Sequence, residues 1–415
     1  MSQIVDGYNY LHLGRSVKKS EHIIATFFIG SQMEINKAAQ VVAGESSIGT
    51  WTDIKTLSKA TFKKLSAKVI QADRRTRIVK IAYPLALFEP SNIAQLLSDV
   101  AGNIFSMKAI PNLRLIDLEF PDKYINSFLG PAFGADGVRH KLKVYKRPLI
   151  GAIMKPKLGL SWKQHAHFAY LAFKGGVDLV KDDENLTDQT FNPFDKRVRE
   201  TVKLARKAEQ ETGQKKLCAF NISASANEMI KRAEFVKKAG GHCAMVDIMT
   251  VGFSGLQALR QARLGLILHG HRAMHSTMTR NPKHGISMTV IAKLARLAGI
   301  DQLHTGTVVG KMEGTARETN DINKFLSCKW GRIKPVMPIA SGGLHPGLVP
   351  QLYKVIGPNV IINFGGGLHG HPKGTYQGAQ AAFQAVEAVT KRIPLKKHAK
   401  SNIALAEAII KWGAG

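Results

Sequence analysis

Short apolar runs recur through the second part of the chain, each followed by a segment with helical spacing. Eight such runs occur from residue 149 onward, and their lengths suit buried strands better than core helices. They are LIGAIMK (149–155), VDLVKD (177–182), LCAFNIS (217–223), CAMVDIM (243–249), LGLILHG (264–270), DQLHTG (301–306), VMPIASG (336–342) and VIINFGG (360–366). Eight β–α units in succession predict a (β/α)8 TIM barrel. A doubly wound open sheet is the alternative, but it rarely runs to eight uninterrupted units.

The segments between these runs include four clear helix candidates, at 162–176, 194–213, 226–241 and 285–299. Each of them reaches a glycine at or near its end, as helix C-termini often do. The barrel is therefore expected to carry its helices between successive strands.

Residues before about 140 follow a different pattern. Strands are expected at 22–29, 66–73, 77–84 and 113–121, and helices at 34–47 and 91–105, the latter with Ser91 as N-cap. Strand-helix-strand-strand-helix-strand is the ferredoxin-like order. The expected fold class is thus α/β, with a smaller ferredoxin-like α+β domain (1–140) before a catalytic barrel domain (141–415) that ends in C-terminal helices.

The charge balance points to anionic ligands. Lys and Arg number 59 against 30 Asp and Glu, a net charge of +29, and such an excess attracts nucleic acid or phosphorylated metabolites. The cations are spread along the chain, and the densest late cluster, 391–400, has no interleaved aromatic residues. A solvated basic surface is therefore favoured over a nucleic-acid partner.

The sequence lacks the patterns of membrane, secreted and zinc-binding proteins, which limits the expected location and redox state. No apolar run approaches the roughly 18 residues of a membrane span, and the first residues lack a signal-peptide pattern. The cysteines, Cys218, Cys243 and Cys328, are odd in number and widely spaced, with no zinc pattern. Reduced thiols, a cytoplasmic location and no membrane partner are expected.

Polar residues stand where the expected barrel strands end, which is where such barrels place reactive groups. The segment KDDE (181–184) offers adjacent carboxylates suited to Mg2+. Lys181 does not fit that role, because an ammonium cannot ligate a metal; from spacing alone it is a counter-ion to the acids. The glycine-rich ends of strands seven and eight, ASGGLHPG and NFGGGLHGHPKG, expose backbone N–H groups that suit phosphate. With Arg272 and Lys311, a substrate with more than one phosphate is expected.

Long motifs throughout the chain carry a specific resemblance. They are AGESSIGTW (43–51), AGNIFSMKA (101–109), GPAFGADGVR (130–139), KPKLGL (155–160), KDDEN (181–185), HGHRAMHSTMTRNPKHGIS (269–287), QLHTGTVVGKMEG (302–314), and the SGGLHPG and FGGG segments. Over nearly its whole length the chain resembles the large subunit of ribulose-1,5-bisphosphate carboxylase/oxygenase (RuBisCO). Its shortness and its KDDENLT and SGGLHPG segments resemble the archaeal form III or a related intermediate form.

The resemblance implies a lyase that adds CO2, or O2 as a side reaction, to the enediolate of ribulose 1,5-bisphosphate, and yields two 3-phosphoglycerate with CO2. Its cofactor is Mg2+, and an activator CO2 is carried as a carbamate on Lys181, which becomes an oxygen ligand beside Asp183 and Glu184. The carbamate removes the C3 proton, Lys155 protonates the final carbanion, and Lys311 closes over the substrate. His271 contacts the C3 hydroxyl.

The same resemblance assigns the binding residues. Those for the substrate and its two phosphates are Lys157, Arg272, His304, Ser341, Gly342, Gly343, Gly366 and Gly367. In the N-terminal domain, Glu45, Thr50, Trp51 and Asn103 match residues that reach the active site of a partner subunit. A homodimer or assembly of dimers with shared sites follows, with no small subunit, and form III implies a role in AMP or nucleoside salvage.

Some positions depart from the commonest family pattern. Leu368 and His369 replace Thr-Leu after the triple glycine, Thr305 stands where Ser is frequent, and Ser106-Met107 replaces Gly-Phe or Gly-Met. None removes a catalytic group. The rival functions are a RuBisCO-like isomerase, enolase or sugar-acid decarboxylase, and a basic nucleic-acid-binding or scaffold protein that keeps only the fold. The retained metal and phosphate residues argue against both.

Overall fold

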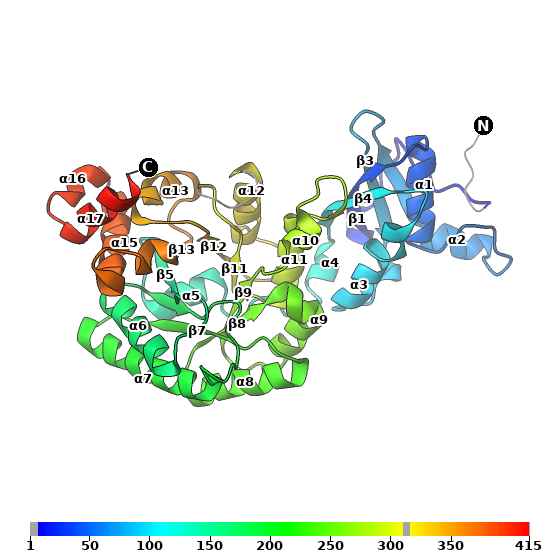
Figure 1. Ribbon diagram of the computed structural model, residues 1–415. Helices are drawn as coiled ribbons and strands as arrows, with labels where there is room; N and C mark the ends of the chain where they lie inside the picture. Colours follow the sequence, from blue (N-terminus) through cyan, green and yellow to red (C-terminus); the bar gives the residue numbers. More distant parts are fainter. Residues whose placement is uncertain (1–6, 310–315, 415) are drawn as a thin grey trace. The chain divides into compact units, whose positions relative to one another are not determined.

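The computed structural model describes residues 7–309 and 316–414, which form two compact units (Figure 1). One unit contains residues up to 129 together with 274–297 and 330–333, and the other contains 130–273, 298–329 and the chain from 334 onward. No helix within the described ranges is both long and apolar enough to cross a membrane.

The smaller unit is built on a mixed five-stranded sheet in the order β10-β4-β1-β3-β2. Its strands are β1 (His22–Gly30), β2 (Lys68–Ala72), β3 (Ile78–Pro84), β4 (Asn112–Glu119) and β10 (Gly285–Ile286). Its helical segments are η1 (Lys19–Glu21), α1 (Ile35–Glu45), α2 (Lys59–Leu65), η2 (Leu85–Leu87), α3 (Ile93–Val100), η3 (Asn103–Ser106), α4 (Asp122–Ile125), α10 (Ser276–Thr279) and α11 (Met288–Ala298). Strands β1 to β4 pair antiparallel in the order β4-β1-β3-β2, as the ferredoxin-like chain order predicts.

Two local expectations in this unit are corrected. The N-cap of α3 is Asn92, whose side chain accepts a hydrogen bond from the Gln95 N–H at 3.0 Å, whereas Ser91 precedes it with φ 62°. The helix expected at 285–299 begins later, because Gly285 and Ile286 pair in parallel with Arg114 and Leu115 of β4. A pairing partner so distant in sequence leaves no mark on the local pattern.

The larger unit is a closed barrel of eight parallel strands, in the order β11-β12-β13-β5-β6-β7-β8-β9. They are β5 (Leu149–Ile153), β6 (Leu179–Lys181), β7 (Leu217–Asn221), β8 (Cys243–Asp247), β9 (Ile267–His271), β11 (Gln302–His304), β12 (Met337–Ser341) and β13 (Ile361–Phe364). Every one of these strands lies within one of the eight apolar runs or extends past it by a single residue, so the predicted TIM barrel is confirmed.

Helices surround the barrel and continue beyond it (Figure 1). They are α5 (Gly134–Leu142), α6 (Trp162–Lys174), α7 (Phe194–Thr212), α8 (Ala226–Lys238), α9 (Ile248–Gln261), α12 (Ala316–Ser327), η4 (Pro346–Leu348), α13 (Val349–Ile356), α14 (Gly366–His369), α15 (Gly374–Thr390), α16 (Leu395–Ala399) and α17 (Ile403–Trp412). Local sequence explains their ends: Ser161 and Gln164 form a capping box at α6, and Gly213 ends α7 with φ 68°.

The barrel interior is apolar near the beginnings of the strands. Leu149, Leu179, Leu217, Ile267 and Ile361 are buried there. Val138 and Leu142 of α5 belong to the same cluster, so α5 closes this end of the barrel. The polar strand ends therefore face the opposite, carboxyl-terminal end, where a ligand can enter.

Candidate functional site

Lys181, Asp183 and Glu184 form a charged cluster at the carboxyl end of β6. Lys181 is the last residue of the strand and is fully buried, and its Nζ lies 3.5 Å from Oε2 of Glu184. This Nζ forms no hydrogen bond with any described residue. The chain has left the strand before Asp183 and Glu184, which places both carboxylates beside the lysine.

The burial of Lys181 makes its ammonium form costly. Burial lowers the pKa of Lys181, against the raising effect of the carboxylates of Glu184, Asp183 and Asp247. Burial also opposes ionisation of Asp183 and Glu184. Lys155, Asn185 and Lys181 together outweigh it at Asp183, and Lys181 and His271 together outweigh it at Glu184, so the pKa of each carboxyl lies below its usual value. The cluster thus combines two ionised acids with an amine that gives up its proton readily.

This donor set fits Mg2+ only if the lysine is modified. Within the described part of the chain, no group of three His, Cys, Asp and Glu side chains could hold a metal ion. Two carboxylates and an amine are present instead, and Mg2+ requires oxygen ligands. A carbamate on Nζ of Lys181, which has an ion-pair contact with Glu184 but no hydrogen bond within the described residues, would supply the missing oxygen and reverse the local charge. The residues therefore fit a carbamate-held Mg2+.

The two lysines after β5 differ in position. Lys155 reaches the cluster and donates a hydrogen bond from Nζ to Oδ2 of Asp183 at 2.6 Å. Lys157 is exposed on the following loop. The structure therefore brings Lys155, but not Lys157, to the acids.

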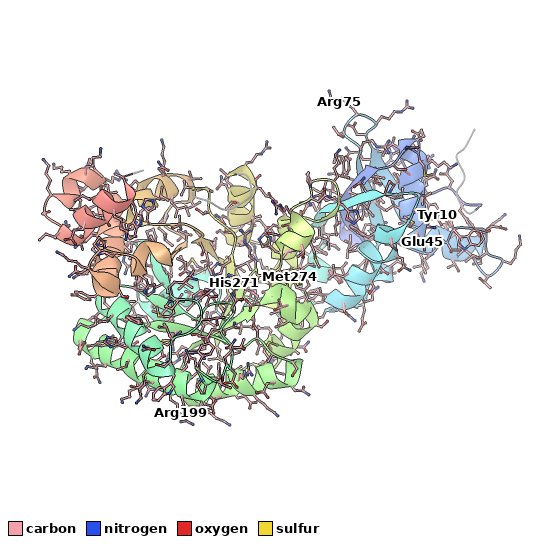
Figure 2. All side chains as sticks on the ribbon, in the orientation of Figure 1. Tyr10, Glu45, Arg75, Arg199, His271 and Met274 are labelled. Atoms are coloured by element: carbon pink, nitrogen blue, oxygen red, sulfur yellow. The ribbon has the colours of Figure 1, made fainter. Side chains whose placement is uncertain are left out.

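His271 lies at the end of β9, inside the barrel unit, whereas Arg199 projects from the outer side of α7 (Figure 2). Nε2 of His271 is 3.6 Å from Oε2 of Glu184, and its Nδ1 is 3.3 Å from Oδ1 of Asp247. The position of Asp247 is fixed in turn by Ser223, whose hydroxyl accepts a hydrogen bond from the Asp247 N–H at 3.0 Å. Strands β6, β8 and β9 thus supply neighbouring groups at one end of the barrel.

His304, at the end of β11, is packed between other rings. Its ring lies 4.6 Å from that of His271 and 5.0 Å from that of His269. Arg272 approaches from the neighbouring strand end, and a Cβ at Gly306 would collide with its guanidinium. Burial lowers the pKa of Arg272 to about 10, so the guanidinium remains a cation at neutral pH.

The glycine-rich loops after β12 and β13 lie against each other. A Cβ at Gly367 would clash with the backbone oxygen of Leu344, so only glycine permits this approach. Gly342 and Gly343 have φ of 119° and 68°, and Gly366 and Gly367 begin the short helix α14. Ser341 ends β12 beside them. Glycines from two neighbouring strand ends thus lie close together, which is the composition expected of a loop that binds phosphate through backbone N–H groups.

Comparison with known proteins decides the family. The family model described as "Ribulose bisphosphate carboxylase large chain, catalytic domain" matches residues 134–412, and the corresponding N-terminal domain model matches residues 10–124. The "Ribulose bisphosphate carboxylase" of Methanosarcina mazei is 48% identical over 423 aligned residues, covering 97% of this chain and 99% of the relative. The chain belongs to the RuBisCO large-chain family.

Solved structures agree with this assignment. The octameric RuBisCO of Pyrococcus horikoshii OT3 is 45% identical with a TM-score of 0.94, covering 97% of this chain and 96% of that chain. The dimeric archaeal RuBisCO of Hyperthermus butylicus is 40% identical with a TM-score of 0.92, covering 98% and 99%. The predicted RuBisCO resemblance, fold class and carboxy-lyase class are confirmed, as is the family's use of Mg2+ with a carbamylated lysine. These relatives do not favour the RuBisCO-like alternative.

The remaining predicted RuBisCO site residues belong to the smaller unit or lie outside the described residues. Glu45, at the end of α1, and Asn103, at the start of η3, belong to the smaller unit, as do Thr50 and Trp51. The side chain of Trp51 is 88% exposed. Lys311 lies outside the described residues.

Sequence reasoning missed the buried residues that support the RuBisCO metal cluster. Asp182 points away from it: its carboxylate lies 3.1 Å from Nε of Arg197 and 3.1 Å from Nε2 of His165. Arg197 also donates to the backbone oxygens of Thr187 and Asn192, and so holds the loop after β6. Burial opposes the ionisation of Asp182, but Arg197 and His165 outweigh it and lower its pKa to about 2. The signal in the sequence for this support is the position of Asp182 directly after Lys181 at the strand end, where successive side chains point to opposite faces.

Proposed function

We propose that this chain converts ribulose 1,5-bisphosphate and CO2 to two 3-phosphoglycerate at the mouth of its barrel, with O2 as a competing substrate. The observation that carries the proposal is the Nζ of Lys181, which is fully buried, has no hydrogen bond from a described residue and lies beside two carboxylates. A buried amine of this kind is costly as an ammonium but suits reaction with CO2 as a neutral nucleophile.

The proposed roles of the side chains follow from where each one lies. The carbamate of Lys181, with Asp183 and Glu184, would hold Mg2+, which when bound stabilises negative charge on substrate oxygens. The carbamate would also accept the C3 proton, with His271 hydrogen-bonded to the C3 hydroxyl. Lys155 already lies 2.6 Å from Asp183, so its ammonium is close enough to protonate the final carbanion once the substrate separates the two. Lys157 would steady Lys155, and Lys311 would stabilise the new carboxylate.

The two phosphates would bind to two different groups of residues near this cluster. Arg272, His304 and Ser341 would hold one of them by charge and hydrogen bonds. The second phosphate would lie on the glycine-rich loops after β12 and β13. The glycines concerned are Gly342, Gly343, Gly366 and Gly367. The close approach of Gly367 to Leu344 supports this assignment, because it leaves backbone N–H groups without side chains in front of them.

The proposal extends to the assembly. The relatives from Pyrococcus horikoshii and Hyperthermus butylicus are described as octameric and dimeric RuBisCO. We propose a homodimer or an assembly of dimers, without a small subunit, in which Glu45, Thr50, Trp51 and Asn103 complete the partner's site. The high exposure of Trp51 supports this, because a large exposed aromatic side chain is typical of an interface.

Three further expectations are kept as part of the proposal. The division into residues 1–140 and 141–415 is supported by family models that match 10–124 and 134–412. The role in AMP or nucleoside salvage follows from the form III resemblance alone. The cytoplasmic location is supported by the three cysteines, Cys218, Cys243 and Cys328, which form no disulfide within the described residues.

One assay tests the proposed activity directly. The purified protein is incubated with labelled bicarbonate and Mg2+, ribulose 1,5-bisphosphate is added, and the products are separated. Labelled 3-phosphoglycerate is expected. Substrate isomerisation or proton exchange without labelled product would instead indicate a RuBisCO-like reaction, and salt-sensitive binding to duplex DNA with no turnover would indicate the scaffold function.

A further inference from the structure

Three buried side chains form a hydrogen-bonded row that ends at the proposed phosphate site. Gln302 Oε1 lies 2.8 Å from Nδ1 of His269, and Nε2 of His269 lies 2.9 Å from Nε2 of His304. Gln302 and His269 are fully buried, and His304 is 3% exposed. Of the three, only His304 is expected to touch substrate.

Burial favours the neutral form of both imidazoles in this row. Burial lowers the pKa of His269 to about 3, with Lys181 and His271 adding to the effect. Burial, together with His271, His269, Lys181 and Arg272, holds the pKa of His304 well below its usual value. Among the described residues, these are the charged or titratable groups that act most strongly on the pair. A neutral imidazole carries a single N–H, so each ring can donate on one side only.

The Nε2–Nε2 hydrogen bond can therefore run in two directions. If His269 donates from Nδ1 to Gln302, then Nε2 of His304 must donate to Nε2 of His269. Nδ1 of His304 then carries a lone pair instead of a hydrogen. Nε2 is the nitrogen through which His304 is hydrogen-bonded to His269, so its Nδ1 is the ring nitrogen left to meet a ligand. A lone pair facing a phosphate oxygen is repulsive, whereas an N–H there would bind it.

The hydrogen bonding of the Gln302 amide favours the other direction, in which His269 donates to His304. With Oε1 toward His269, the two hydrogens of Nε2 are buried and find no acceptor among the described residues. Rotating the amide by a half-turn keeps its shape and turns the NH2 group toward Nδ1 of His269. His269 then donates from Nε2 to His304, and His304 donates from Nδ1 outward.

We propose that Gln302 is a positioning residue for phosphate binding: its NH2 group donates to His269 and thereby fixes His304 as the tautomer whose Nδ1–H faces a phosphate oxygen. The proposal rests on the proposed function, since it takes His304 as a phosphate ligand. It gives the site a neutral donor, whose strength does not depend on protonating a buried histidine.

Gln302→Glu is the decisive variant, because it keeps the length of the side chain and removes its ability to donate when ionised. The carboxylate accepts from Nδ1 of His269, reverses the row and turns the lone pair of His304 outward. The KM for ribulose 1,5-bisphosphate is expected to rise about ten- to a hundredfold at pH 8 with kcat within about threefold, and the Ki for inorganic phosphate is expected to rise in parallel.

The pH profile distinguishes this role from simple damage. One proton added to the introduced carboxylate or to His269 restores the outward N–H, so the excess KM of the Gln302→Glu variant is expected to shrink as the pH falls from 8.5 to 6.5. Gln302→Met, which can neither donate nor accept, is the matched control and is expected to show a smaller rise in KM that does not change with pH. The Gln302→Met variant also tests the proposal if Gln302→Glu fails to fold. An unaltered KM in Gln302→Met would overturn the proposal.

Two outcomes separate this proposal from the function on which it rests. If His304→Ala leaves KM unchanged, His304 is not a phosphate ligand and the site assignment fails. If His304→Ala raises KM but Gln302→Glu binds substrate and phosphate like the wild type at every pH, only the positioning role of Gln302 is lost.

Discussion

The chemistry of the site depends on the surroundings of single side chains, and Lys181 is the clearest case. Its amine lies in a fully buried position at a strand end, near three carboxylates but without a hydrogen bond to any described residue. The carboxylates favour the ammonium and burial opposes it, and burial is the larger effect because the pKa is lowered. A side chain balanced in this way is prepared for a change of charge by carbamylation.

Replacing Lys181 by Met should abolish carboxylation while leaving the protein folded. Loss of the carbamate removes both the base and a metal ligand, so we expect activity to fall by about a thousandfold or more. Wild-type activity should rise after preincubation with CO2 and Mg2+ together, more strongly at alkaline pH where more amine is neutral. Fixation of labelled bicarbonate measures both effects.

The control for this variant is Lys174→Met. Lys174 is on α6, where it pairs with Glu211 at 3.0 Å, and its loss should leave fixation unaltered. Thermal unfolding should show that both variants are folded. Full activity in Lys181→Met would overturn the metal-site assignment.

A second buried lysine links stability to pH. Nζ of Lys216 donates to the backbone oxygen of Val177 at 2.8 Å and to Gln214 at 3.0 Å, and burial lowers its pKa to about 8. The unfolded pKa is near 10.5, so between these values the unfolded chain binds more protons. The free energy of unfolding should therefore rise by about 2–4 kcal/mol, from this group alone, as the pH increases from 8 to 10.5.

Denaturant unfolding of Lys216→Met at about pH 7.5 and about pH 10 tests this linkage. The free energy of unfolding should increase from the lower to the higher pH in the wild type by more than it does in Lys216→Met, so the variant should be relatively less stable at the higher pH. Lys215→Met is the matched control, since Lys215 is half-exposed and pairs with Glu209 at 3.1 Å, and it should follow the wild type at both pH values. Parallel behaviour of Lys216→Met and wild type would show that the pKa of Lys216 is not depressed.

At the scale of helices and strands, the sequence was most informative where burial is uniform. A strand buried on both faces reads as a short apolar run, so the runs at 149–155 and 217–223 predicted β5 and β7 closely. The strand ends likewise predicted polar side chains at one end of the barrel, and Lys181 and His271 both lie there, each beside Glu184. What could not be predicted depends on partners distant in sequence: the pairing of Gly285 with Arg114, and the contact of Lys155 with Asp183.

The buried row of Gln302, His269 and His304 could be predicted from the sequence only in part. Gln302 and His304 are two apart on β11 and so share a face, and His269 belongs to the adjacent strand β9. The spacing was visible in the sequence, but the adjacency of the two strands follows only from closing the barrel. Polar side chains inside apolar runs are thus the signal most easily overlooked.

Asp301 joins three elements of the barrel unit and should be important for its stability. Its Oδ1 accepts from the N–H groups of Phe133 and Gly134 at 2.6 and 2.7 Å, and its Oδ2 accepts from Leu268 at 2.9 Å. In Asp301→Asn, an NH2 group would face one of these donors. Burial raises the pKa of this carboxyl in spite of the three bonds, so the neutral amide recovers part of the loss. We expect a decrease of about 1–3 kcal/mol in the free energy of unfolding.

Chemical denaturation at neutral pH measures this change. Asp321→Asn serves as the comparison, because Asp321 is exposed on α12 and its contact with Arg317 is 3.9 Å long. That variant should be as stable as the wild type. Equal stability of Asp301→Asn would mean that the three backbone groups find other acceptors without cost.

At the scale of the whole molecule, the predicted site residues divide between two structural units. Lys155, Lys181 and His271 belong to the barrel unit, whereas Glu45 and Trp51 belong to the smaller one. Residues in separate units can meet within one chain or between two chains. In a two-fold dimer each subunit offers the same surface to the other, so one contact completes two sites at once.

Complementation between two inactive variants tests the shared site. Glu45→Gln and Lys181→Met are co-expressed, so that half of the dimers are mixed under random pairing. If the sites are shared, each mixed dimer contains one site with both lesions and one with neither, and about a quarter of wild-type activity should return. If each site is built within one chain, every site carries a lesion and no activity returns. Two affinity tags isolate the mixed dimers, in which the expected activity is about half that of the wild type. Mixed dimers obtained in good yield but without fixation activity would show that Glu45 does not contribute to the partner's site. The assignment of the lysine and carboxylate cluster in the barrel would be unaffected, because it rests on distances within the barrel unit.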